Sequence, residues 1–369
     1  MSSAPDQRIA RVREALANAG ADWLLIPASA DFAWLTGGHA RATERLVLFA
    51  LPRTGTPWGL VPKLEAEALA AECPWLELEV WEEHEDPVAR LAGRIQLDRR
   101  PTLLLGEGFR TGPLLTLAAR AICRPAAPVL APLRACKDAA ELARLETAGR
   151  HADQVMAETA AMLRPGLTER QVSRFIFDRF ESLGDHDPWA IVAAGPNAAF
   201  PHHMSSTRTL ADGEVVLLDL GAYHEGYGSD ITRTFWLGRP PEGFAAVYGT
   251  VNEARAAGIA AARAGVPAAA VDAAARSVIE RAGYGPSFVH RTGHGVGLEI
   301  HEPPYLVAGN QALLLAGMVH SVEPGIYLPG RFGVRLEDLV VVEPGGGRRL
   351  NHAPLAPALG TPAPQRVAG

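Results

Sequence analysis

The chain has 369 residues, a formal net charge of −6 at pH 7 and three cysteines. This length is more than one average domain needs, and the acidic balance gives no reason to expect nucleic acid or an anionic membrane as a partner. No apolar run reaches the roughly 18 residues of a transmembrane helix. Because the cysteines are few and far apart, the sequence favours a reducing cytoplasm and excludes a cysteine zinc site.

Residues 1–133 alternate between helical and strand-like stretches, which predicts a small N-terminal α/β domain around a central sheet. The prolines at 125, 128 and 132 interrupt this pattern. An apolar spacing typical of a helix then continues for about 25 residues, until Pro165 and Gly166 end it. We therefore expect a second domain over 134–369, opened by this long helix, and an α/β (α+β) fold class for the whole chain.

The stretch RTGHGVGLEIHE, residues 291–302, places glycines on both sides of a histidine. Glycines of this density disfavour a helix, since each costs roughly 1 kcal/mol relative to alanine. In a strand, histidines seven residues apart would point to opposite faces. We expect a tight irregular backbone here that brings His294 close to other groups.

Two acids flank the centre of an expected hairpin over 214–238, EVVLLDLGAYHEGYGSDITRTFWLG. If its turn centres on residues 224 and 225, Asp219 lies directly opposite Asp230. A single buried aspartate is more often a structural residue. Two carboxylates facing each other in apolar surroundings repel unless a proton or a cation lies between them, and a metal is the simpler explanation.

A second hairpin repeats the arrangement in SVEPGIYLPGRFGVRLEDLVVVEPG. A turn centred on Gly330 pairs Glu323 with Glu337, and the adjacent Asp338 then points away. Four carboxylates and the imidazole of His294 suit Mn²⁺, Co²⁺, Zn²⁺ or Fe²⁺. This number of acids fits two ions about 3.5–4 Å apart rather than one.

Five ordered blocks carry a family resemblance: VAAGPNAAFPHH, LLDLGAYHEGYGSDITRTF, HRTGHGVGLEIHEPP, SVEPGIY and GVRLEDLVVV. They resemble the "pita-bread" metallopeptidases of family M24, and most closely its proline-specific members, aminopeptidase P and prolidase. The resemblance covers residues 136–355 and implies a C-terminal pita-bread catalytic domain. The N-terminal domain resembles the small creatinase/prolidase-like domain only in length and general pattern.

The resemblance implies a ligand set by position. Asp219 matches a chelating ligand of one metal, and Asp230 and Glu337 match the acids that bridge two metals. His294 and Glu323 match ligands of the other metal. Glu323 also matches the family's proton shuttle. The implied cofactors are two divalent ions, with Mn²⁺ expected first and Co²⁺ or Zn²⁺ as alternatives.

Three further residues match positions near the substrate. His202 matches a histidine that stabilises the tetrahedral intermediate, and His301 matches one that contacts the substrate near the scissile bond. We therefore expect both to be catalytic and substrate-binding. Arg335 matches an arginine that braces the site, and we assign it to substrate binding as well.

The resemblance implies an exopeptidase that cleaves between an N-terminal residue and proline in proline-containing peptides. Many prolidases carry an arginine just after the second histidine, whereas the segment 301–320 of this chain contains no arginine or lysine to bind the free carboxylate of a dipeptide. Arg331, at the tip of the second hairpin, and Arg335 are the alternative partners of that carboxylate. We therefore favour an aminopeptidase P-like enzyme. The alternative is a prolidase restricted to Xaa-Pro dipeptides. Methionine aminopeptidase, a metal-free creatinase-like hydrolase and a peptide-binding module are less favoured. We also expect a cytoplasmic homodimer that binds neither nucleic acid nor membrane.

Overall fold

A computed structural model describes residues 4–355 of the chain, and the C-terminal end of the expected catalytic domain, 356–369, lies outside them. The chain divides into two compact units, Met1–Arg134 and Ala135–Gly369. This division lies next to the expected boundary at residue 133. The prolines that interrupt the N-terminal pattern do not form a loop, because Pro128 and Pro132 lie within a short helix.

The first unit is built on one six-stranded sheet with the order β4-β3-β2-β1-β5-β6. Strand β1 pairs antiparallel with β2 and parallel with β5. The strands are β1 Trp23–Pro27, β2 Leu48–Pro52, β3 Trp58–Pro62, β4 Glu77–Trp81, β5 Thr102–Leu105 and β6 Ile122–Pro125. The helices are α1 Ala4–Asn18, α2 Ala30–Thr36, α3 Lys63–Glu72, α4 Pro87–Arg94, α5 Thr111–Ala118 and α6 Ala127–Ala135, with a 3₁₀ turn at Leu97–Arg99.

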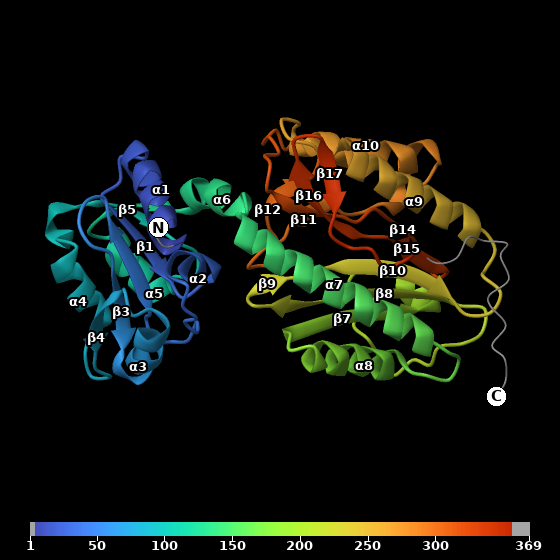
Figure 1. The fold of residues 1–369 in the computed structure, drawn as a ribbon, viewed down its shortest axis with the longest axis horizontal. Helices are drawn as coiled ribbons and strands as arrows, with labels where there is room; N and C mark the ends of the chain where they lie inside the picture. The colour runs from blue at the N-terminus through green and yellow to red at the C-terminus, as the bar shows by residue number, and fades with distance from the viewer. Residues whose placement is uncertain (1–3, 356–369) are drawn as a thin grey trace. The chain divides into compact units, whose positions relative to one another are not determined.

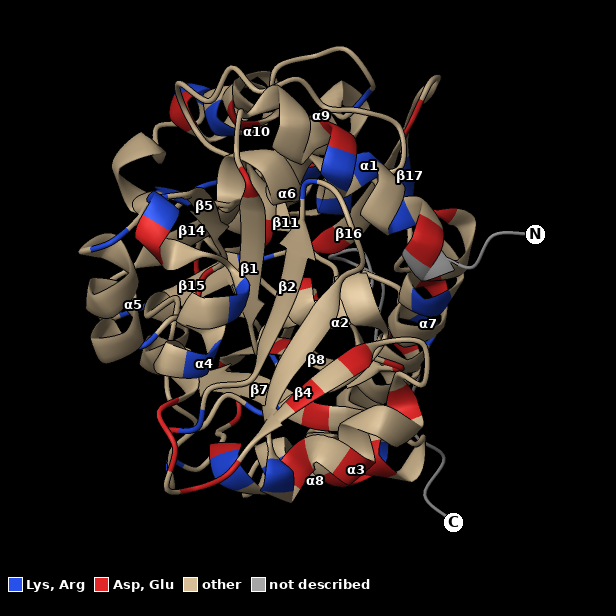
Figure 2. Ribbon diagram, turned by 90° about the vertical axis from the view of Figure 1, so that its left-hand side faces the viewer, with Lys and Arg blue, Asp and Glu red and all other residues tan. Residues whose placement is uncertain are grey.

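The centre of this sheet consists of uncharged strands. Strands β1 and β2 carry no charged residue, whereas the edge strand β4 carries Glu77 and Glu79 (Figure 2). Arg94 of α4 forms ion pairs with both glutamates. The continuous apolar runs of the central strands are typical of strands that are buried on both faces. The structure therefore confirms the α/β pattern expected for the N-terminal part of the chain.

The second unit contains a three-stranded sheet β10-β8-β7 with β9 added to β8, a five-stranded sheet β12-β11-β13-β16-β17, and the hairpin β14-β15. Its strands are β7 His186–Ala194, β8 Val215–His224, β9 Tyr227–Gly228, β10 Ile231–Trp236, β11 Gly293–Gly295, β12 Glu302–Leu306, β13 Val319–Val322, β14 Gly325–Leu328, β15 Phe332–Arg335, β16 Asp338–Glu343 and β17 Gly346–Arg349. Its helices are α7 Ala139–Met162, α8 Glu169–Ser182, α9 Phe244–Ala261 and α10 Ala268–Arg281, with 3₁₀ turns at Gly195–Ala199 and Gly285–Ser287.

Within this unit the helices lie outside and the strands between them (Figure 1). Helices α7 and α8 pack on β7, β8 and β10 through a cluster that includes Met156, Ile176 and Leu218. Helices α9 and α10 pack on β14 and β15 through a cluster that includes Val251 and Ile279. The long helix expected at the start of the domain is confirmed as α7. It begins at a capping box, in which the Asp138 carboxylate accepts hydrogen bonds from two backbone amides.

The hairpin β8–β9–β10 has a different register from the expected one. Its turn centres on Glu225 and Gly226, both with positive φ, so Asp219 pairs with Thr232 rather than with Asp230. A two-residue turn of this kind matches the twist of the strands, which explains the shift. Because side chains alternate with a period of two, a displacement of two residues leaves Asp219 and Asp230 on the same face.

The second hairpin has the expected register. Gly325 pairs with Arg335 in β14–β15, and Val322 pairs with Asp338 in β13–β16. These pairs flank Glu323 and Glu337 on both sides and place the two glutamates opposite each other. The expectation that Glu337 rather than Asp338 belongs to the acid pair agrees with this geometry.

The glycines around His294 permit close backbone approach, although the segment is not wholly irregular as expected. Residues 293–295 form the short strand β11, with a register shift after His294. A Cβ atom on Gly293 would lie 2.0 Å from the carbonyl oxygen of Ser321, and one on Gly295 would lie 2.4 Å from that of Pro303. The glycines therefore let β11 fit between β12 and β13, which fixes the position of the His294 side chain.

Glu169, the first residue of α8, holds the connection between β7 and β8. Its buried carboxylate accepts hydrogen bonds from the amide of Ala194, the side chain of Asn197, and both the amide and hydroxyl of Ser206, and it lies 2.8 Å from Nε2 of His203. Burial alone would raise the pKa of Glu169, but these hydrogen bonds lower it from 4.5 to about 2. The carboxylate thus fixes a segment that carries part of the expected site.

Replacing Glu169 with glutamine should lower the free energy of unfolding by roughly 2 kcal/mol at pH 7, because several buried donors lose an ionised acceptor. The folded-state pKa lies below the unfolded value, so this stabilisation is complete above pH 4.5 and is lost as the pH falls towards 2. Urea unfolding of both proteins should therefore show a difference that shrinks below pH 4.5. Glu181→Gln, an exposed residue of the same helix, should change stability by about 0.5 kcal/mol or less. An equal effect of the two substitutions would contradict the role given to Glu169.

Candidate active site

One cavity of about 600 Å³ in the second unit is lined by every residue of the expected site. These residues come from strands of both sheets, from the segments beside β13 and β15, and from the connection that Glu169 holds. They are His202, Asp219, Asp230, His294, His301, Glu323, Arg335 and Glu337. The structure thus brings together side chains that are up to 135 positions apart in the sequence, although their roles in catalysis remain predictions.

Three ligand atoms converge most closely within this cavity. One donor atom from each of Asp230, His294 and Glu337 lies within 4.8 Å of the others, and all three residues are buried. Glu323 joins them through Nε2 of His294, which lies 3.3 Å from Oε1 of Glu323 and 3.7 Å from Oδ2 of Asp230. Asp219 lies beside this group on the same face of the sheet as Asp230.

The buried carboxylates have oxygen atoms that the protein does not satisfy. Oδ1 of Asp219, Oδ1 of Asp230 and Oε1 of Glu337 have no hydrogen-bond partner among residues 4–355. Burial, followed by repulsion from Glu337, raises the pKa of Asp230 well above its usual value. Burial and repulsion from Glu323 do the same to the pKa of Glu337. Oxygen atoms of this kind, beside an imidazole, are suited to hold divalent cations, so the residues fit the expected ligand set.

Glu323 differs from the other acids of the cavity. Burial alone would raise its pKa, but hydrogen bonding to His294 and the electrostatic effect of that ring lower it to about 2. The carboxylate of Glu323 is therefore ionised at neutral pH. Partial burial and the nearby His294 and Arg291 lower the pKa of His301 to about 4, so this imidazole is neutral at neutral pH.

Arg335 braces the acids from one side. Its Nη2 donates to Oδ2 of Asp219, its Nη1 to the hydroxyl of Tyr327 and the carbonyl of Pro201, and its Nε to the hydroxyl of Thr232. The hydroxyl of Thr232 in turn donates to Oε2 of Glu337 over 2.7 Å. Because protein groups engage all three of its nitrogen atoms, these contacts favour the bracing role over direct contact with substrate.

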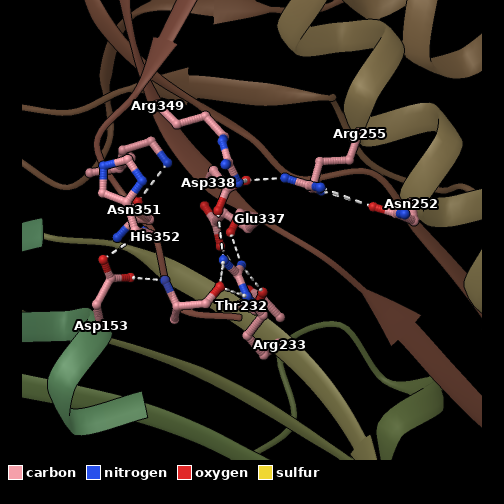
Figure 3. Close-up of polar contacts among 12 residues, drawn as sticks. Asp153, Thr232, Arg233, Asn252, Arg255, Glu337, Asp338, Arg349, Asn351 and His352 are labelled. Atoms are coloured by element: carbon pink, nitrogen blue, oxygen red, sulfur yellow. Dashed lines mark hydrogen bonds and ion pairs between the residues drawn. The ribbon is translucent and has the colours of Figure 1, made fainter. Parts of the chain in front are cut away.

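Behind Glu337, Asp338 anchors a cluster of arginines (Figure 3). Its carboxylate accepts hydrogen bonds from Arg233 and Arg255 and lies 3.6 Å from Arg349. Arg233 also donates to the carbonyl oxygen of Glu337 itself. Asp338 and Arg233 are fully buried, and breaking such a pair typically costs roughly 3–5 kcal/mol. This cluster fixes the backbone that presents Glu337 to the cavity.

Of the histidines in or near the cavity, two are exposed to solvent and two form hydrogen bonds with protein side chains. His202 and His301 line the cavity and are exposed, so both can reach a substrate. His203, by contrast, bonds to Glu169. His290 lines the cavity with its Nε2 2.8 Å from the hydroxyl of Tyr327, which connects it to the contacts of Arg335.

The cavity also contains residues that the sequence did not single out. Trp189 and Ile191 of β7 form an apolar wall, and Ile191 pairs with Asp219 in the sheet. Trp189 and Ile191 are two positions apart on one strand, which predicts that they share a face, but only the strand pairing shows that Ile191 lies beside Asp219. Gly221 makes room for this wall, since a Cβ there would lie 2.8 Å from the Trp189 ring.

Arg291 is the second cation of the cavity and was also missed. Its guanidinium lies over the ring of Tyr305, 4.3 Å from the ring centroid. Within the described part of the chain, no carboxylate forms an ion pair with it. Arg331, suggested by the sequence as a carboxylate partner, instead donates to the carbonyl oxygen of Glu242 and does not line the cavity.

Comparison with known proteins identifies the relatives of this chain. Residues 143–344 match metallopeptidase family M24, and residues 8–101 match the creatinase/prolidase N-terminal domain. The chain is 39% identical over 362 residues to a probable dipeptidase PepE of Mycobacterium tuberculosis, covering 94% of each protein. It is 33% identical to a Xaa-Pro dipeptidase of Lactobacillus delbrueckii, covering 90% of this chain and 93% of that one.

A solved prolidase from Thermococcus sibiricus has the same fold, with a TM-score of 0.90 and 34% identity, covering 96% of this chain and all of that one. No helix among residues 4–355 is long and apolar enough to cross a membrane. The matched family, the cluster of buried acids around His294 and the pita-bread fold lead to one conclusion. The chain belongs to metallopeptidase family M24 and is a peptidase of the prolidase type.

Proposed function

We propose that the protein is a two-metal exopeptidase that hydrolyses Xaa-Pro dipeptides. The observation that carries this proposal is the set of unsatisfied carboxylate oxygens on Asp219, Asp230 and Glu337, gathered beside His294 in one cavity. Asp230 and Glu337 would bridge two divalent ions, Asp219 would chelate one of them, and His294 and Glu323 would hold the other. Two ions at such a centre supply Lewis acidity and lower the pKa of a shared water.

The side chains of the cavity would then bind the peptide and move its proton. Glu323, ionised at neutral pH, would accept the proton released from the attacking water and pass it to the leaving proline nitrogen. The exposed imidazole of His202 would donate a hydrogen bond to the oxyanion that forms at the scissile carbonyl. His301 would contact the peptide beside the scissile bond, and Trp189 and Ile191 would offer an apolar surface to its side chains.

The identity of the metal, the oligomeric state and the cellular location are proposed from the sequence. We propose Mn²⁺ as the metal, with Co²⁺ and Zn²⁺ as alternatives, because oxygen ligands dominate the set. We also propose a homodimer, for which light scattering is the test. A cytoplasmic location rests on the scarcity and spacing of the cysteines.

The length of the peptide depends on where its terminal carboxylate binds. The absence of a cation from residues 301–320 favoured an aminopeptidase P-like enzyme, and this remains the second candidate. However, Arg291 lies on Tyr305, a residue of that segment, and so brings a cation to it. Because no carboxylate among the described residues forms an ion pair with Arg291, its guanidinium suits a substrate carboxylate. The relatives named above as dipeptidases or prolidase support the same choice.

Replacing Asp230 with asparagine should remove bound metal and lower kcat/KM on Ala-Pro by on the order of 100-fold or more, because the acid would bridge both ions. Elemental analysis after dialysis against Mn²⁺ gives the metal content, and proline release gives the rate. Asp178→Asn, an exposed residue of α8, should leave both values unchanged. Full activity and metal content in the Asp230 variant would rule out the proposed centre.

The choice of peptide length is tested with Ala-Pro, Ala-Pro amide and Ala-Pro-Ala. The wild-type protein should prefer Ala-Pro, and Arg291→Gln should lower kcat/KM on Ala-Pro by roughly 10–100-fold, the cost of a lost charged hydrogen bond. Hydrolysis of the neutral amide should change little, because it lacks the charge that Arg291 would bind. Arg331→Gln is the matched control. A wild-type preference for Ala-Pro-Ala would support the aminopeptidase P-like alternative.

A further inference from the structure

Outside the catalytic cavity, two imidazoles converge on one carboxylate. Nδ1 of His151, from α7, lies 3.0 and 2.9 Å from the two oxygens of Asp185, which precedes β7. Nδ1 of His224, the last residue of β8, lies 2.9 Å from Oδ1 of the same carboxylate. The two rings meet edge to face with centroids 5.0 Å apart. Three segments that are distant in the sequence thus direct three donor atoms to one point, all within 4.8 Å of one another.

The buried carboxylate of Asp185 needs groups that compensate its negative charge. Its side chain is 2% exposed, and a buried carboxylate is costly unless a cation or several hydrogen bonds compensate it. The polar contacts of this carboxylate within residues 4–355 are the two imidazole nitrogens. No arginine or lysine of the described chain forms an ion pair with it, so the two imidazoles or a bound metal have to compensate its charge.

The ligand types favour a metal. Two imidazoles and one carboxylate make up a set that binds Zn²⁺ with three protein ligands and leaves a fourth position to water. The His151 and His224 side chains are 20% and 23% exposed, so one side of the cluster is accessible to solvent. We propose that His151, Asp185 and His224 form a separate site for one divalent transition-metal ion, with Zn²⁺ as the expected occupant.

An ion at this position would stabilise the hairpin that carries two acids of the catalytic cavity, Asp219 and Asp230. His224 ends the strand that contains Asp219, and the turn at Glu225 and Gly226 leads through β9 to Asp230. The ion would fasten the tip of this hairpin to α7 and to the start of β7. The existing contact between Arg144 of α7 and Glu225 already joins the same elements, at the exposed surface. The site would therefore stabilise the fold without contacting substrate.

The number of bound ions tests the proposal directly. The full-length protein is stripped with a chelator, reloaded with Zn²⁺, passed through a desalting column and analysed for zinc per chain. His151→Ala and Asp185→Asn should each bind one ion fewer than the wild type. His186→Ala is the matched control, because this neighbouring exposed histidine contacts Asp187 rather than Asp185, and it should bind as many ions as the wild type. Circular dichroism of each variant checks that it is folded.

A second measurement separates this site from the catalytic one. In an Asp230→Asn background, Zn²⁺ should still raise the melting temperature, since a ligand that binds only the folded state stabilises it. Adding His151→Ala should remove that shift. Because the zinc count is read as a difference between variants, it does not depend on whether the protein hydrolyses Xaa-Pro peptides. Equal zinc content in the wild type, His151→Ala and Asp185→Asn would overturn the proposal and leave a plain hydrogen-bonded network.

Discussion

The catalytic unit depends on the repulsion between acids that are buried together. Asp219, Asp230, Glu323 and Glu337 share one cavity and are held in place by strands of different sheets. Carboxylates so close in a medium of low polarity do not all ionise without cations. The protein therefore has to hold them rigidly against a repulsion that would separate them, and the same repulsion suits the cavity to divalent ions.

Two networks of positive charge oppose this repulsion, one at the wall of the cavity and one behind Glu337. Arg335 engages Asp219 directly and reaches Glu337 through the hydroxyl of Thr232. Arg233 holds the backbone of Glu337 and also pairs with Asp338, so neighbouring residues in the sequence are fixed on opposite sides of one strand. Such supporting contacts orient ligands and typically influence metal affinity by about 10- to 100-fold.

The network of hydrogen bonds around the cavity extends to the residues that would contact the substrate. Glu169 fixes the connection that carries His202, and Tyr327 joins Arg335 to His290. Arg291 stands apart from this network, since the ring of Tyr305 supports it while its charge stays available. Protein groups thus engage Arg335, whereas Arg291 of the same cavity forms no ion pair with a carboxylate among residues 4–355.

The hydrophobic pattern predicted the two hairpins, the long helix α7 and the α/β character of the first unit, and together with the family resemblance it predicted eight of the residues that line the cavity. It could do so because hydrophobic periodicity and turn residues are local properties, and because alternation on a strand fixes which side chains share a face. For the same reason the error of two residues in the register of β8 and β10 left Asp219 and Asp230 on one face. Only the tertiary structure showed that Asp219 pairs with Thr232. Only the tertiary structure showed that protein groups engage Arg335, whereas Arg291 forms no ion pair among the described residues. It also showed that His151, Asp185 and His224 lie together. These depend on contacts between residues far apart in the chain, which neither spacing nor periodicity encodes.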